Sequence, residues 1–481
     1  MKNNKTMIHS IIIIALVLGF GFLPPIGAVT PFGMKVLGGF LGCIYAYTVG
    51  IIMWPSLFVM FYLAFIQGTT FNAVIASAFG HQSVWMIAIA LVFCAGLSKC
   101  GLLTTISQWL LSKKIIKKGP YYFLASIWGI TWILGVITMA PIPTFIMMVQ
   151  MAHELMEQVG VKKYSAYSNL LICGLAVFAY VGGSIFAFTG MTLIVFSTFI
   201  SSGWTDTISY FNYTLYTLAV TVVFFASSLI ITKFVLRPRI DFDITNLTLT
   251  SVKKLSLTQA QKIALICLAA VIVLLFLPSF LPAESAITSA INKIAFPGAA
   301  IIVAIVLSFT PKESGSKEHV MELDEEFKNS FNWNQIMLLA TIFIFSSLLT
   351  SPTTGITDLL MSLTAPIFAG HSAFVTLLLL VLAACIVTNC LNNMVTVALL
   401  TPIAITYAGT AGLDVNLVLA AYGLIITQGC ALPSGSAVGA LLHSNTDLIK
   451  SKSIYGYASL YTLILAVMAV VVAWLMQGFI G

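Results

Sequence analysis

The stretch TNCLNNMVTVALLTPIA, residues 388–404, carries two Thr and three Asn in its first nine residues, inside a strongly apolar part of the chain. A helix that crosses a membrane satisfies its own backbone. Amides and hydroxyls in the middle of an apolar run therefore indicate a break that lines a cavity or contacts a ligand. Another polar break, ALPSGSAVG, follows at residues 431–439. Together the two breaks predict a binding site inside a membrane protein.

The composition places the whole chain in a membrane. Of its 481 residues 59% are hydrophobic and only 8% are charged, a composition that excludes a water-soluble globular protein. Apolar runs of roughly twenty residues, the length that crosses a bilayer, recur along the chain. The first of them, near residues 10–28, is interpreted as an uncleaved helix rather than a signal peptide. We therefore expect one all-α polytopic protein of the cell membrane, spanning residues 1–480.

The positions of Lys and Arg predict the topology, because these residues stay on the cytoplasmic side of the membrane. About eleven crossings, with the N-terminus inside and the C-terminus outside, leave only Lys35 and Lys293 on the outer side. This arrangement requires two apolar segments, 120–157 and 372–408, to enter the membrane and return to the side from which they came. We interpret both as re-entrant helical hairpins.

Two halves of the chain share this pattern and predict an inverted repeat. Residues 31–236 and 263–480, joined by a connector at 237–262, each contain one hairpin and an odd number of crossings, so the second half runs upside down relative to the first. In the first half the polar breaks are TMAPIPTFIMM (138–148) and VGGSIFAFTGMT (181–192). Breaks at matching positions predict a transport site where the two halves meet.

The charged residues restrict the cargo. All fifteen Asp and Glu fall in predicted loops or near helix ends, so no carboxylate marks a proton or cation path through the membrane. An anionic solute fits better, held by helix N-termini and neutral side chains, with charge compensation from a co-transported cation. No P-loop is present, so ATP drive would need another chain. Neither an organic cofactor nor a nucleic-acid partner is expected.

The sequence resembles the divalent anion:sodium symporters over nearly its whole length. The resemblance implies an elevator-type homodimer that carries di- or tricarboxylates such as succinate, malate or citrate, or sulfate. It also implies a sodium ion at each hairpin tip and the anion between the tips. The stretches that carry the resemblance are FLPPIG, SVWMIAIALVFCAGLSKCGL (83–102), MAPIPTFIMM (139–148), WNQIMLL with TGITDLL (333–360), residues 388–404 and CALPSGSAVGALL (430–442).

Both hairpin tips depart from the Ser-Asn-Thr triplet of that family. The resemblance implies a sodium site in the second repeat and a weakened one in the first, where Phe145 replaces the central amide. The second-repeat ligands would be Thr388, Leu391, Asn393 and Gly435. The first-repeat positions would be Ala140, Thr144, Phe145 and Gly183. The anion would be contacted by Thr144, Phe145, Ser184, Asn392, Asn393 and Ser436.

We therefore predict a secondary active transporter of small dianions, cation-coupled through a weakened first site. The alternatives are a sodium-independent organic anion exchanger or oxyanion permease of the wider superfamily, and an intramembrane enzyme. At the level of residues, the Asn cluster could instead be hydrogen-bond glue between helices, and Gly182, Gly183, Gly435 and Gly439 could serve helix packing alone. The loop at 310–330 is interpreted as a solvated cytoplasmic connector.

Overall fold

The computed structural model describes residues 2–201, 209–244, 255–282, 284–313, 316–329, 333–349, 351–445 and 448–480. Within these ranges the regular structure is helical, and β pairing is limited to one isolated bridge between Pro311 and His319. Among the described residues, eight helices are long and apolar enough to cross a membrane, or nine if the bent pair α4 and α5 forms one span. The all-α membrane fold is confirmed at this level, and the larger span count stays a prediction.

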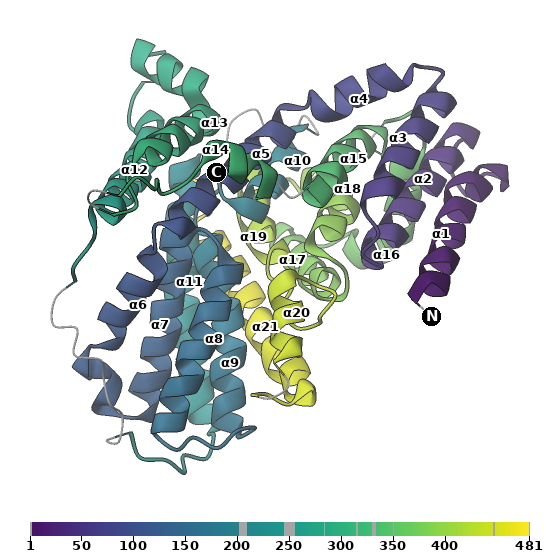
Figure 1. Ribbon diagram of the computed structural model, residues 1–481. Helices are drawn as coiled ribbons and strands as arrows, with labels where there is room; N and C mark the ends of the chain where they lie inside the picture. The colour runs from purple at the N-terminus through teal and green to yellow at the C-terminus, as the bar shows by residue number, and fades with distance from the viewer. Residues whose placement is uncertain are drawn as a thin grey trace.

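The helices form several groups around a central region (Figure 1). On one side lie α1 (Lys2–Gly19), α2 (Pro31–Thr48), α3 (Met53–Gln67), α4 (Phe71–Phe79), α15 (Trp333–Leu349) and α16 (Ile356–Phe368). On the other lie α6 (Leu102–Leu111), α7 (Pro120–Thr138), α8 (Pro141–Gln158), α9 (Ala166–Gly183), α11 (Tyr210–Ile230), α12 (Gln259–Phe276), α13 (Ala286–Phe309) and α14 (Leu323–Asn329). Between them lie α5 (Gln82–Lys99), α10 (Gly190–Ser201), α17 (Ala373–Cys390), α18 (Asn393–Thr410), α19 (Val415–Ile426), α20 (Ala437–Ser444) and α21 (Ser451–Leu475), and the short α22 (Gln477–Ile480) ends the described chain.

Two helix pairs coincide with the segments predicted as hairpins. Helices α7 and α8 pack together and are separated only by Met139 and Ala140, and α17 and α18 are separated only by Leu391 and Asn392. Local chemistry explains both restarts: Pro141 occupies the first turn of α8, and the Asn392 side chain accepts a 2.9 Å hydrogen bond from the Met394 N–H. The chain is thus broken at each predicted tip.

The following helices are also interrupted where the sequence turns polar. Helix α9 ends at Gly183 and α10 begins at Gly190, while α19 ends at Ile426 and α20 begins at Ala437. Helix α9 packs closely on α7, and a Cβ on Gly182 would lie 2.4 Å from the Trp132 carbonyl oxygen. This close approach supports the packing interpretation for Gly182.

The connector at 310–330 is exposed over most of its described residues, as interpreted, but Val320, Met321 and Glu326 in its second half are buried, and the interpretation is wrong at these positions. Val320 and Met321 are buried, and a Cβ on Gly96 of α5 would meet the Met321 sulfur at 2.7 Å. The fully buried carboxylate of Glu326 forms an ion pair with Lys99 at the end of α5. Apolar side chains within an acidic stretch hold this segment against the helix ends.

The predicted topology is testable by thiol labelling. In a variant that lacks the eight native cysteines, Thr410→Cys at the exposed end of α18 should react with an impermeant maleimide in intact cells. The matched variant Lys317→Cys, in the connector, should react only after permeabilisation. Labelling of residue 317 in intact cells would contradict the eleven-crossing topology.

Candidate functional site

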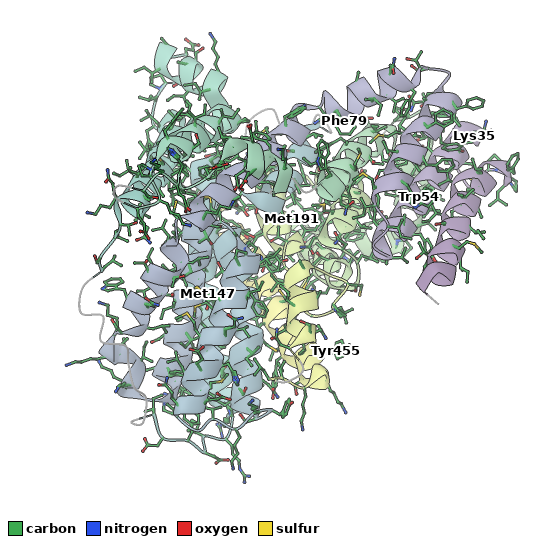
Figure 2. All side chains as sticks on the ribbon, in the orientation of Figure 1. Lys35, Trp54, Phe79, Met147, Met191 and Tyr455 are labelled. Carbon is green, nitrogen blue, oxygen red and sulfur yellow. The ribbon has the colours of Figure 1, made fainter. Side chains whose placement is uncertain are left out.

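A cavity of about 460 Å³ lies where the helix breaks of both halves meet. Met191, labelled in Figure 2, contributes to its lining. The first half contributes the tip before α8 and the start of α10, and the second half contributes the tip before α18 and the start of α20. The lining residues are Ile52, Ile87, Ala90, Leu91, Cys94, Met139, Ala140, Pro141, Ile142, Pro143, Tyr180, Gly190, Met191, Asn334, Leu338, Asn392, Asn393, Met394, Gly435, Ser436 and Ala437.

The described residues that line this cavity include no charged side chain, but several of them belong to helix N-termini. Its lining contains residues from the first turn or N-cap of α8, α10, α15, α18 and α20. The first N–H groups of a helix have no intrahelical acceptor, and the helix dipole adds partial positive charge there. Helix α8 contributes less, because two of its first three residues are Pro141 and Pro143, which have no N–H. Some N–H groups are already used, since those of Met394 and Gly439 donate to the caps Asn392 and Ser436. The remaining N–H groups and the helix dipoles give the cavity a partial positive character without a Lys or Arg.

The tip of the second half is tied to the break before α20 by side-chain hydrogen bonds. The Thr388 hydroxyl lies 2.8 Å from Asn393 Oδ1 and 2.6 Å from the Ile426 carbonyl oxygen. Asn393 donates from Nδ2 to the Thr427 carbonyl (3.0 Å) and from its backbone N–H to the Gly435 carbonyl (3.1 Å). Each bond satisfies a polar group that the broken helices leave buried.

Both polar atoms of the Asn389 side chain are used in hydrogen bonds of the second tip and the break before α20. Its Nδ2 donates to the Cys385 carbonyl at 2.7 Å, and its Oδ1 accepts a 2.7 Å hydrogen bond from the Ala431 N–H. The hydrogen-bond glue interpretation therefore describes Asn389, which does not line the cavity. Asn392 differs, since its Oδ1 caps α18 while its side chain lines the cavity.

Carbonyl oxygens converge beside Gly435. A point in the position of a Cβ on Gly435 lies 2.8 Å from the Thr388 oxygen, 2.9 Å from the Gly429 oxygen and 3.1 Å from the Asn389 oxygen. A corresponding point on Gly429 lies 2.5 Å from Asn393 Oδ1. Neutral oxygens in such a cluster are the ligands that hard cations prefer. The carbonyls of Asn389 and Gly429 were not among the predicted ligands.

The equivalent place in the first half is filled by carbon. A Cβ on Gly183 would meet Pro141 Cδ at 3.0 Å and Cγ at 3.4 Å. The Gly183 carbonyl accepts a hydrogen bond from the Thr189 hydroxyl at 2.8 Å. A proline ring thus occupies the space that, beside Gly435, is bounded by oxygens.

Several predicted site residues lie outside the cavity lining. Thr144 and Phe145 are fully buried in α8, and the Thr144 hydroxyl lies 3.0 Å from that of Thr138. The Ser184 hydroxyl lies 3.1 Å from that of Thr427, which joins the breaks of the two halves. Of the predicted anion contacts, the structure brings together Asn392, Asn393 and Ser436 on the cavity wall.

Sequence reasoning missed cavity residues that come from helices outside the tips. Asn334 lies in the first turn of α15, Tyr180 lies near the end of α9, and Ile52 precedes α3. Ile52 and Tyr180 carry no local signal, because each reaches the cavity through the packing of its helix. Asn334 lies in the WNQIMLL stretch that carries the family resemblance, and this stretch is the sequence signal that could have drawn attention to it.

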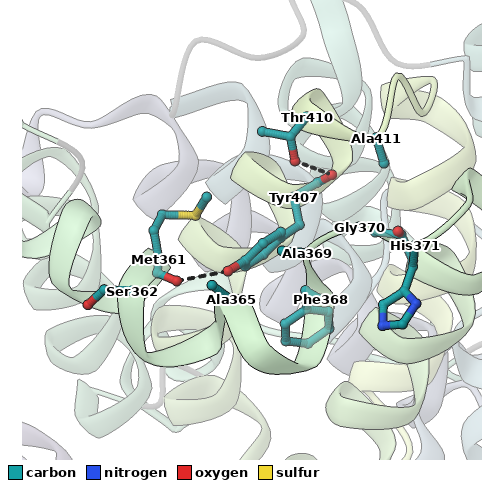
Figure 3. Close-up of a pocket in the computed structure, with 11 residues that line it drawn as sticks. Met361, Ser362, Ala365, Phe368, Ala369, Gly370, His371, Tyr407, Thr410 and Ala411 are labelled. Carbon is teal, nitrogen blue, oxygen red and sulfur yellow. Dashed lines mark hydrogen bonds between the residues drawn. The ribbon is translucent and has the colours of Figure 1, made fainter.

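A second cavity, of about 430 Å³, lies apart from the breaks (Figure 3). It is formed by α16, the start of α17 and the end of α18, and the Tyr407 hydroxyl on its wall donates to the Met361 carbonyl at 3.0 Å. None of the predicted site residues lines it. We therefore assign the candidate site to the cavity between the breaks.

Comparison with known proteins supports the fold but identifies no family. No protein-family model and no curated protein matches the sequence. Twenty-six solved chains match the structure, among them the YdaH transporter of Alcanivorax borkumensis, whose description reports an unusual topology. That chain is 14% identical, with a TM-score of 0.55, and the match covers 85% of this protein and 88% of YdaH. The chain thus shares the fold of a membrane transporter.

The oxygen cluster predicts a sharp difference between two glycines. Gly429→Ala would place a methyl group 2.6 Å from the Thr388 carbonyl oxygen, whereas Gly423→Ala in α19 meets nothing closer than side-chain carbons at 3.6 Å. We expect Gly429→Ala to lose about 1–3 kcal/mol of stability, the usual cost of overpacking, and Gly423→Ala to change little. Thermal unfolding in detergent measures both, and equal melting temperatures would count against the tight cluster.

Proposed function

We propose that the protein is a secondary active transporter of a small anion, coupled to a cation at one site rather than two. The observation that carries this proposal is the neutral cavity between the breaks, which has helix N-termini on several sides and a cluster of carbonyl oxygens at Gly435. One set of groups suits an anion and the other suits a cation. Placing both ligands side by side is the chemistry of a symporter.

Two neutral side chains on the cavity wall are suited to orient the anion. Asn392 lines the cavity with its Oδ1 engaged by the Met394 N–H, so its amide N–H groups are available as donors. Asn334 adds a second amide from α15. Carboxylates and sulfate accept hydrogen bonds from such donors. Ser436 has a different role, because its hydroxyl donates to the Gly429 carbonyl and accepts from the Gly439 N–H at 3.0 Å, which fixes the start of α20 at the cavity.

A cation at the Gly435 cluster would supply positive charge that the side chains lack. The Thr388 backbone oxygen belongs to this cluster, and Asn393 Oδ1 lies beside the neighbouring Gly429 and 2.8 Å from the Thr388 hydroxyl, which supports these two residues as cation ligands. The Pro141 ring beside Gly183 supports the loss of a second cation site, together with the apolar Phe145 at that tip. We infer sodium as the coupling ion, because neutral oxygens without a carboxylate favour a monovalent hard cation.

The proposal includes the architecture that the sequence predicts. The helix pairs α7/α8 and α17/α18 would re-enter from opposite sides, and the tips would move with the cargo as part of an elevator in a homodimer. The matched breaks at residues 139–140 and 391–392 and the transporter fold support this view.

Sodium-independent exchange is the second candidate, and one observation favours it. The Thr388 hydroxyl already has acceptors in Asn393 Oδ1 and the Ile426 carbonyl, so the second tip is satisfied without an ion. Counter-transport of two anions through the same cavity would then need no cation. The sodium dependence of uptake separates this candidate from the first.

Removal of the Asn392 amide tests the anion site. Asn392→Ala should weaken substrate affinity about five- to a hundredfold, since an unmatched polar group in a desolvated site costs roughly 1–3 kcal/mol. Uptake of labelled succinate, malate, citrate and sulfate into proteoliposomes measures this. The control Asn212→Ala removes an exposed amide whose partner is the Phe479 carbonyl, and it should leave uptake unchanged. Equal affinities in native protein and Asn392→Ala would exclude Asn392 from the site.

A matched pair of threonine variants tests the single cation site. Native uptake should rise with sodium with a Hill coefficient of about one, and Thr388→Val should abolish that dependence by removing a coordinating oxygen. Thr144→Val makes the same change at the first tip and should preserve it. A Hill coefficient of about two in the native protein would show a second working cation site, while uptake indifferent to sodium would favour exchange.

A further inference from the structure

A third cavity, of about 450 Å³, lies at one end of the N-terminal helices and far from the candidate site. Figure 2 shows its residue Lys35 at the outer edge of this helix group, away from Met191. The cavity is formed by the end of α1 with the short turn after it, the start of α2 and the second half of α3. Its lining residues are Leu18, Gly21, Phe22, Lys35, Phe58, Phe61, Tyr62, Phe65 and Ile66.

The walls of this cavity are aromatic and face outward. Phe22, in the turn after α1, is 90% exposed, and Phe65 on α3 is 81% exposed; Phe61, one turn before Phe65, is also exposed. Side chains of this size gain free energy by leaving water, so their exposure is expected only against lipid or another apolar partner. A concave surface of this kind fits flexible acyl chains.

Among the described residues that line this cavity, Lys35 is the charged one. It lies in the second turn of α2, inside an otherwise uncharged helix, and it is exposed. Among the described residues, no carboxylate lies within ion-pair distance of its Nζ. A charged side chain in a membrane helix costs free energy unless it reaches the interface or pairs with an opposite charge. We therefore expect an anion beside the Lys35 ammonium group.

The Lys35 stem and the Tyr62 hydroxyl meet at one end of the cavity. A Cβ on Gly21 would lie 2.8 Å from Lys35 Cγ and 3.6 Å from Tyr62 Oη, so both side chains converge on the Gly21 backbone. The absence of a side chain at Gly21 leaves room for this arrangement. A cation and a phenol at one end of an aromatic wall match an amphiphile that has an anionic head and an apolar tail.

We propose that this cavity binds an anionic membrane lipid, with the phosphate or carboxylate of its head group at Lys35 and Tyr62 and its acyl chain along Phe58, Phe61 and Phe65. Basic pockets between membrane helices are suited to anionic head groups. The site uses none of the residues assigned to transport. It therefore stands or fails independently of the proposed function.

Native mass spectrometry of the full chain tests the site, because it reports bound lipid and oligomeric state together. The protein is titrated with phosphatidylglycerol, phosphatidylcholine, oleate and glycerol phosphate. We expect phosphatidylglycerol to bind more tightly than phosphatidylcholine, and Lys35→Gln to weaken the phosphatidylglycerol adduct roughly fivefold, the worth of one interfacial lysine. Lys293→Gln, which removes the other exposed lysine of the predicted outer side, should have no effect.

Each other outcome identifies a different occupant. Oleate that binds as tightly as phosphatidylglycerol, with the same loss in Lys35→Gln, supports the site and makes a carboxylate its ligand. If glycerol phosphate binds as tightly as phosphatidylglycerol, the proposed acyl-chain contacts are overturned and the cavity is a site for a small anion. Equal phosphatidylglycerol binding by native protein and Lys35→Gln overturns the proposal. Dimers that dissociate in Lys35→Gln, with no lipid adduct in the native protein, would place a second copy on this surface instead.

Discussion

The need to satisfy backbone polar groups at broken helices governs the centre of this protein. At membrane depth no water is available for the N–H and C=O groups that a break exposes, so side chains must serve them. Asn389 bonds the Ala431 N–H, Asn393 bonds the Thr427 carbonyl, and Ser434 donates to the Cys390 carbonyl at 2.9 Å. The dense cluster of amides and hydroxyls around residue 390 is therefore first a structural necessity. Only Asn392 and Asn393 also reach the cavity.

The positions of the helix breaks could be predicted, because they follow from local chemistry. A proline at the start of α8 and an asparagine that caps α18 mark where each helix begins again after its break. The helix pairs α7/α8 and α17/α18 begin and end within a few residues of the predicted segments 120–157 and 372–408. Lys and Arg also indicate helix ends, because their charged groups stay in water. Each of these signals depends on neighbouring residues in the sequence and not on how the helices pack.

The directions of individual side chains could not be predicted in the same way. Thr144 and Phe145 occupy the positions that the resemblance gives to ligands, but the rotation of α8 buries them and brings Pro141 and Ile142 to the cavity. Asn334 enters from a helix that is distant in sequence. The buried Glu326 shows the same limit, since its partner Lys99 lies 227 positions away. Packing between distant helices decides all three cases.

The proline ring beside Gly183 has an energetic consequence for the carrier as proposed. A dianion that enters with one monovalent cation moves one net negative charge inward, against a membrane potential that costs about 2.3 kcal/mol per 100 mV. Two cations would make the same step electroneutral. A single cation site therefore favours a singly charged cargo, or exchange of one dianion for another. In the carrier as proposed, the charge of the cargo thus depends on the Pro141 ring, which lies beside Gly183 where oxygens lie beside Gly435.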